Sequence, residues 1–121
     1  MILQPQQSSI RVWFAESVEH AVSVSSEIIL DYDGMGRVIG GEVVGVSHAL
    51  NGTPQTNGCA EYFADEDSLH FRLAPDLRGV DSDDVEGSLL VNGSYVVGVE
   101  VPVSPIVLAA TKQLFRDHWR E

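Results

Sequence analysis

An internal repeat is the feature that most constrains how this chain can fold. The segment Ile2–Phe14 aligns without a gap on Glu61–Leu73, and Val38–Val43 aligns on Val96–Val101. The first pair alternates apolar and polar residues, which is the pattern of a half-buried strand. A repeat of this length indicates two copies of one small structural unit. We therefore expect a mainly β (α+β) fold in which two β-hairpin repeats pack as a pseudo-two-fold small barrel or sandwich, followed by one C-terminal α-helix.

The repeat also suggests how the chain is divided. We expect a first β repeat over residues 1–47, a linker over 48–59 and a second β repeat over 60–104. The linker is polar and contains two Asn-Gly steps and a proline, which favour turns over regular structure. Residues 105–121 would form the helix. At 121 residues the chain is short enough for both copies to share one compact domain.

The later strands of each copy are predicted as hairpins, 27–32 with 37–46 and 87–91 with 95–103. Residues 17–26 are mixed, and we expect an irregular link or a short edge strand there. Ser104 and Pro105 form a typical helix start, because serine can cap free N–H groups and proline fits the first helical position. The apolar pattern predicts about four turns, ending near Arg120. This helix would cover the sheet of its own chain or be exchanged between subunits.

The charge of the chain limits its partners. Asp and Glu total 18 against 7 Lys and Arg, for a formal net charge of −11. Such a field repels phosphate backbones, so we expect no direct nucleic-acid binding and favour a basic protein as partner. Acidic residues are dense between Glu61 and Glu86. The partner-binding candidates are Asp65, Glu66, Asp67, Asp81, Asp83, Asp84 and Glu86.

The expected compartment follows from what the sequence lacks. Cys59 is the only cysteine, so no internal disulfide can form, which suits a reducing compartment. The apolar runs are too short to span a membrane, and the first residues do not have the pattern of a secretory signal. We expect a cytoplasmic protein without membrane association, of bacterial or phage origin, as a monomer or homodimer.

One segment partly matches a calcium-binding loop. Counting from Asp31, acidic residues stand at positions one, three and twelve, which makes Asp31, Asp33 and Glu42 candidate metal ligands. Met35 stands where another oxygen ligand is needed, and strands rather than helices are predicted on both sides. The pattern is also that of a β-turn in which aspartate side chains accept backbone N–H bonds. We favour the turn and assign no metal or cofactor.

No group of residues forms a recognisable catalytic motif. None of the four histidines has metal-ligand spacing with another histidine or with Cys59. His70 aligns with Arg11, and Glu42 occupies the same place in the first copy as Glu100 in the second. A site between the copies could use Glu42, Glu100, Asp31 or His70, and a carboxylate pair could do acid–base chemistry at a separation of about 5–9 Å. We expect a protein that is not an enzyme.

Several segments resemble a known family. Leu30–Asp33 and Gly36–Val43 are similar to the closing hairpin of the bacterial domain-of-unknown-function family 2283, and Leu3–Val12 resembles its opening. In the second copy, Glu61–Phe71 is similar to the opening, and 89–101 is a shortened closing without the aspartates. The resemblance covers about two-thirds of the chain and excludes the C-terminal helix. It implies a β-rich unit without known catalytic residues and, by analogy with companions of small toxins, an antitoxin-like role.

These observations lead to three functional hypotheses. The first is a non-enzymatic protein-interaction module, antitoxin-like or inhibitory, that binds a basic partner. The second is a small enzyme or ligand-binding protein with a site between the repeats. The third is a virus-encoded mimic of DNA, with acidic side chains spaced along one face.

Overall fold

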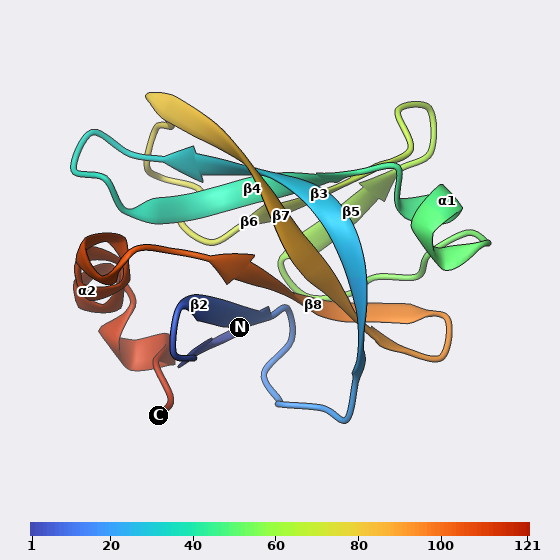
Figure 1. The fold of residues 1–121 in the computed structure, drawn as a ribbon, viewed down its shortest axis with the longest axis horizontal. Helices are drawn as coiled ribbons and strands as arrows, with labels where there is room; N and C mark the ends of the chain where they lie inside the picture. The colour runs from blue at the N-terminus through green and yellow to red at the C-terminus, as the bar shows by residue number, and fades with distance from the viewer.

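The computed structural model describes all 121 residues and contains one antiparallel sheet of eight strands, curled into a half-barrel (Figure 1). Its spatial order is β1-β2-β8-β7-β3-β4-β6-β5. The mainly β prediction is therefore confirmed, with a single curled sheet instead of two stacked ones. The strands are β1 (Ile2–Pro5), β2 (Ser9–Trp13), β3 (Val22–Tyr32), β4 (Val38–Val44), β5 (Ala60–Phe63), β6 (Ser68–Arg72), β7 (Asp81–Asn92) and β8 (Tyr95–Pro102).

Strand pairing relates the two halves of the sheet by a pseudo-two-fold. The opening hairpin β1–β2 pairs through β2 with β8, and the opening hairpin β5–β6 pairs through β6 with β4. Each opening hairpin thus joins the closing hairpin of the other half. Strands β3 and β7 pair at the centre, where Glu27 lies opposite Glu86. The registers agree residue by residue, since Arg11 lies opposite Glu100 and His70 lies opposite Glu42.

Alternation along the strands explains the main core. Every second residue points to the concave face, so Ile28 and Leu30 of β3 are fully buried there, as are Leu69 and Phe71 of β6. A cluster of 17 buried apolar residues fills this face. A second cluster of four, Ile2, Trp13, Leu90 and Val97, is separate from the first.

The two central strands are longer than the sequence predicts. Residues 22–26, expected as an irregular link or edge strand, form the first part of β3, and residues 81–86 form the first part of β7. These stretches are polar and largely exposed, so their side chains give little strand signal. Their backbones pair with each other over eleven residue positions from Val22–Val91 to Tyr32–Asp81. Hydrogen bonding between β3 and β7 therefore holds these stretches in strand conformation, although their side-chain pattern does not predict it.

The C-terminal helix is present but shorter than expected. Helix α2 (Pro105–Leu114) begins as predicted, with the Ser104 side chain accepting a hydrogen bond from the Val107 N–H at 3.3 Å. It ends at Leu114 because Phe115 leaves helical geometry and is buried in the core. A short 3₁₀ helix, η1 (Arg116–His118), follows. The prediction of a continuous helix over 105–121 is therefore wrong at its C-terminal end.

The helix packs on its own chain. The buried Thr111 hydroxyl accepts a hydrogen bond from the Val38 N–H at 3.1 Å, and Val107, Leu108 and Leu114 pack against the main core. After η1 the chain returns to the edge strand β1, where the Arg120 N–H donates to the Leu3 carbonyl at 2.8 Å.

The segment between the halves contains one element that the sequence did not predict. Helix α1 (Val46–Leu50) occupies the expected end of a strand and the start of the linker. Strand β4 stops at Val44 because Gly45 adopts a left-handed conformation, with φ of 68°, and turns the chain. Neither α1 nor α2 has the length and apolar character needed to cross a bilayer.

Candidate functional site

The candidate site lies on the outer face of the sheet, which we define as the face opposite the main core. The register of β3, β4 and β6 places Asp31, Gly40 and Arg72 in one cross-strand row. Glu42 and His70 lie opposite each other in the next row. Neighbouring strands are about 4.8 Å apart, so these polar side chains are close neighbours.

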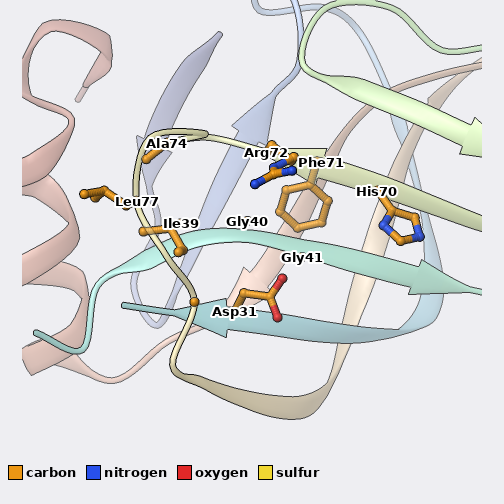
Figure 2. Close-up of a pocket in the computed structure, with 10 residues that line it drawn as sticks. Asp31, Ile39, Gly40, Gly41, His70, Phe71, Arg72, Ala74 and Leu77 are labelled. Atoms are coloured by element: carbon orange, nitrogen blue, oxygen red, sulfur yellow. The ribbon is translucent and has the colours of Figure 1, made fainter. Parts of the chain in front are cut away.

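A small polar pocket opens in this region (Figure 2). It has a volume of about 190 Å³, and its lining includes Asp31, His70 and Arg72 together with Leu77 and Gly79. Partial burial raises the pKa of Asp31, and the nearby charge of Glu42 raises it further, while His70 and Arg72 act in the opposite direction. The pocket therefore holds an acid with an altered pKa beside a fixed positive charge.

Three potential ligand atoms meet at the edge of the pocket. His70 Nε2 lies 3.6 Å from Glu42 Oε1 and 3.7 Å from Glu66 Oε2. The ligand atoms of these three residues all lie within 4.8 Å of one another. The buried Ser68 hydroxyl is 3.1 Å from His70 Nε2 and 3.2 Å from Glu66 Oε2. The Phe63 ring packs edge-on against the imidazole at a centroid distance of 4.7 Å, which restricts the imidazole's rotation.

The equivalent place in the other half of the sheet is a simple ion pair. Arg11 Nε donates to Glu100 Oε1 at 2.6 Å, and Ser9 donates to Glu100 Oε2 at 3.1 Å. Arg11 corresponds to His70, and Glu100 to Glu42, in the aligned registers. One half therefore places a permanent cation beside its glutamate, and the other places a titratable imidazole there.

The pocket also differs from its counterpart. The registers make Trp13 equivalent to Arg72 and Leu90 equivalent to Asp31. Trp13 and Leu90 are buried in the smaller apolar cluster, and the Trp13 indole donates to Gln4 Oε1 at 2.7 Å. Apolar side chains thus fill the place in one half that is a polar pocket in the other.

A group of acidic side chains surrounds the pseudo-two-fold. Glu27 and Glu86 lie directly opposite each other on β3 and β7. A hydrogen bond with Asp84, together with the charge of Asp84, raises the pKa of Glu27. Ser25 donates to Glu86 Oε1 at 3.2 Å. Strands β3, β4 and β7 are adjacent in the sheet and contain no Lys, Arg or His.

The three candidate metal ligands do not converge. The Asp33 carboxylate accepts hydrogen bonds from the N–H groups of Met35 and Arg37, each at 3.0 Å, and pairs with the Arg37 guanidinium at 2.7 Å. Asp33 therefore stabilises a turn by accepting backbone N–H bonds, as the β-turn interpretation of this segment predicts. Asp31 lines the pocket, and Glu42 faces His70.

The predicted partner-binding acids are divided among several places. Asp84 and Glu86 face outward, whereas Asp81 and Asp83 point to the opposite side of β7 by alternation. Asp65 and Glu66 lie in the turn between β5 and β6. Asp67 has a structural role, because its Oδ1 accepts hydrogen bonds from the Tyr62 hydroxyl and the Ser47 N–H, at 2.6 and 2.9 Å.

The hypothetical site between the copies contains some of its expected residues. Asp31, His70 and Glu42 lie together, where strands of the first copy meet β6 of the second. Glu100 lies apart from them, because β7 and β3 separate β8 from β4 by about 14 Å. A Glu42–Glu100 carboxylate pair for acid–base chemistry is therefore not formed.

Sequence reasoning does not single out Arg72, although Arg72 supplies the fixed charge of the pocket. The signal lies in the repeat, where this position changes from tryptophan in the first copy to arginine in the second. A change from apolar to charged at equivalent positions indicates that one copy has a different surface.

Comparisons of this chain with known protein families, with curated proteins and with solved structures found no match. The resemblance to family 2283 therefore stays a prediction.

Proposed function

We propose that this chain is a non-enzymatic interaction protein that binds a basic partner through an acidic face, defined as Glu27, Asp31, Glu42, Asp84 and Glu86. The observation that carries this proposal is that three adjacent central strands present acids and no basic side chain. Directly opposed like charges destabilise a sheet. A cationic partner would remove that repulsion, so binding and folding would favour the same arrangement.

The positions of the charges on the acidic face also support the proposal. The exposed Glu27, Asp84 and Glu86 lie on long paired strands, which hold the carboxylates in a fixed pattern. A fixed pattern of charge steers association and selects a complementary partner. By analogy with the family that the sequence resembles, the partner would be a small basic toxin, which would give the chain an antitoxin-like role.

The test is capture of partners from a bacterial lysate on the immobilised chain. We expect a basic protein that salt elutes, because charge attraction weakens as ionic strength rises. The variant Glu27→Gln/Asp84→Asn/Glu86→Gln should bind that protein at least roughly tenfold more weakly. The control Glu19→Gln/Asp76→Asn/Asp117→Asn removes the same charge from exposed positions outside the acidic face and should bind as the wild type does.

Two outcomes would count against the acidic face as the binding surface. Equal loss in both triple variants would show that net charge alone attracts the partner. Recovery of no basic protein by the wild type would remove the main support for the proposal. If DNA competes with the chain for the captured partner, the result would instead support the hypothesis that the chain is a mimic of DNA.

A second candidate function is ligand binding in the pocket beside Asp31, His70 and Arg72. The observation in its favour is the pairing of an acid with a fixed positive charge in a concave site, since such groups orient small polar ligands. Backbone amide shifts during titration with small polar metabolites would test it. Shifts confined to these strands and lost in Arg72→Ala would support the candidate, and unchanged spectra would reject it.

A further inference from the structure

We propose that Glu42, Glu66 and His70 form a binding site for a divalent transition-metal cation, with Zn²⁺ as the best match. One imidazole nitrogen and two carboxylate oxygens are common zinc ligands. The three ligand atoms lie within 4.8 Å of one another in the structure. This site goes beyond the proposed partner binding. It shares only Glu42 with the acidic face and depends on coordination rather than on the total charge of that face.

The existing distances are close to those that coordination requires. Zinc lies about 2.0–2.1 Å from its nitrogen and oxygen ligands, and tetrahedral geometry then places neighbouring ligand atoms about 3.3 Å apart. The distances from His70 Nε2 to Glu42 Oε1 and to Glu66 Oε2 are 3.6 and 3.7 Å. Shifts of a few tenths of an ångström would therefore bring each carboxylate oxygen to coordination spacing from the imidazole nitrogen, and the two carboxylates, within 4.8 Å of each other, would close on a shared ion.

The surrounding fold holds the three ligands in place. Strand pairing fixes Glu42 directly opposite His70. Glu66 is held by a turn in which its N–H donates to the Phe63 carbonyl at 3.3 Å. The hydroxyl of Ser68, whose side chain is buried, lies at hydrogen-bond distance from both His70 and Glu66. Such a hydroxyl can orient a ligating carboxylate, as supporting hydrogen bonds do in known metal sites.

The pseudo-two-fold gives independent evidence that a cation belongs here. At the equivalent position, the Arg11 guanidinium lies 2.6 Å from Glu100 and balances its charge. Where the other half has arginine, this half has His70, which carries no charge when neutral. Glu42 and Glu66 form no ion pair with Lys or Arg. A bound divalent ion would supply the positive charge that arginine supplies in the counterpart.

The exposure of the site suits an exchangeable ion. The side chains of His70, Glu42 and Glu66 are 38, 32 and 63% exposed, so an ion could enter directly from solvent. Three protein ligands leave at least one coordination position for water or for an outside group. Mixed nitrogen and oxygen ligands favour zinc and its neighbours over Mg²⁺ or Ca²⁺, which prefer oxygen alone.

The test is calorimetric titration of the untagged full chain with ZnCl₂, with the His70 ring nitrogens followed by NMR. We expect one equivalent of zinc and a shift of the Nε2 resonance. His70→Gln should weaken binding by at least about tenfold, because even loss of a residue that only supports a ligand costs that much at known metal sites. Circular dichroism would check that this variant keeps its fold. The control His20→Gln changes an exposed histidine away from the site and should bind zinc as the wild type does.

Three results would overturn the proposal. One is the absence of saturable heat with zinc, and another is unchanged stoichiometric binding in His70→Gln. The third is equal affinity for Ca²⁺, which would indicate general attraction to carboxylates rather than coordination by the imidazole. None of these results bears on capture of a basic protein, so failure here and failure of the proposed function can be told apart.

Discussion

At the scale of single residues, the two halves of the sheet have the same geometry and different chemistry. Arg11, Trp13 and Leu90 in one half correspond to His70, Arg72 and Asp31 in the other. These positions share strand register, so backbone geometry does not explain the change. In the first set, arginine forms a salt bridge with Glu100, and the other two residues are buried in an apolar cluster. The second set leaves a polar pocket with titratable groups.

Asp33 illustrates a residue whose role is structural, and it gives a prediction about pH. Burial alone raises the pKa of its carboxyl, but the hydrogen bonds from Arg37 and Met35 and the charge of Arg37 outweigh burial, so the pKa is lowered. A lowered folded-state pKa stabilises the fold above the unfolded-state pKa of about 3.9, and this contribution disappears as pH falls through the folded-state value.

We therefore expect Asp33→Ala to lower the free energy of unfolding at pH 7 by about 2 kcal/mol, through loss of charge-assisted hydrogen bonds. The difference from the wild type should shrink as the pH is lowered from 5 to 2. Urea unfolding at several pH values would measure it. Asp76→Ala, at an exposed position, should have little effect at any pH. A difference that stays constant with pH would show that the carboxylate charge is not the cause.

At the scale of elements, close contact between strands limits which side chains the sheet can hold. A Cβ atom added at Gly98 would lie 2.3 Å from the Val12 carbonyl oxygen across the β2–β8 pair. At the equivalent Gly40 it would lie 2.6 Å from the Phe71 carbonyl oxygen, across β4–β6. Both halves therefore use glycine where β2 and β6 approach their partner strands.

This contact predicts that Gly98→Ala destabilises the protein. We expect a loss of about 1–3 kcal/mol in the free energy of unfolding, since the carbonyl is backbone and has to be displaced. Gly34→Ala is the matched control, because a Cβ there meets nothing within 4 Å. Urea unfolding of both variants would decide it. Equal stability of the two would mean that the strands separate at little cost.

Comparison of the elements shows what the sequence could and could not predict. The short hairpins β1–β2 and β5–β6 are recognisable because apolar and polar residues alternate in β2 and β6. The polar starts of β3 and β7 are not, because their strand conformation depends on pairing between distant segments. The end of α2 depends on Phe115 filling the core, which no local pattern shows.

Pairing between distant segments also explains why the candidate site could not be predicted from the sequence. The contact between Glu42 and His70 arises from strand order, because β4 pairs with β6 of the other half. Sequence spacing alone gives no sign of that pairing, so the histidines lack any recognisable ligand pattern. The repeat alignment does show that His70 replaces Arg11. Only the strand register shows that Glu42 lies opposite His70.

At the scale of the whole molecule, the halves are joined by exchange of hairpins. Within residues 1–52, no strand pair connects the β1–β2 hairpin to the β3–β4 hairpin. All connections run through the other half, by β2–β8, β3–β7 and β4–β6. Neither half can therefore complete a sheet or a core alone, although the linker between them is exposed at Gly52 and Thr53.

This arrangement predicts that two fragments fold only together. We expect residues 1–52 and 53–121, each purified alone, to show little β-sheet signal in circular dichroism. An equimolar mixture should recover the spectrum of the intact chain and elute as a one-to-one complex in size-exclusion chromatography with light scattering. The complex should weaken on dilution, because cutting the linker makes association depend on concentration.

A control cut between residues 92 and 93, within the β7–β8 hairpin, separates strands that pair with each other and leaves the first half attached to β7. We expect more residual structure in its larger fragment than in either half. A folded monomer formed by residues 1–52 alone would contradict the prediction, since it would show that hairpin exchange is not required for the first half to fold.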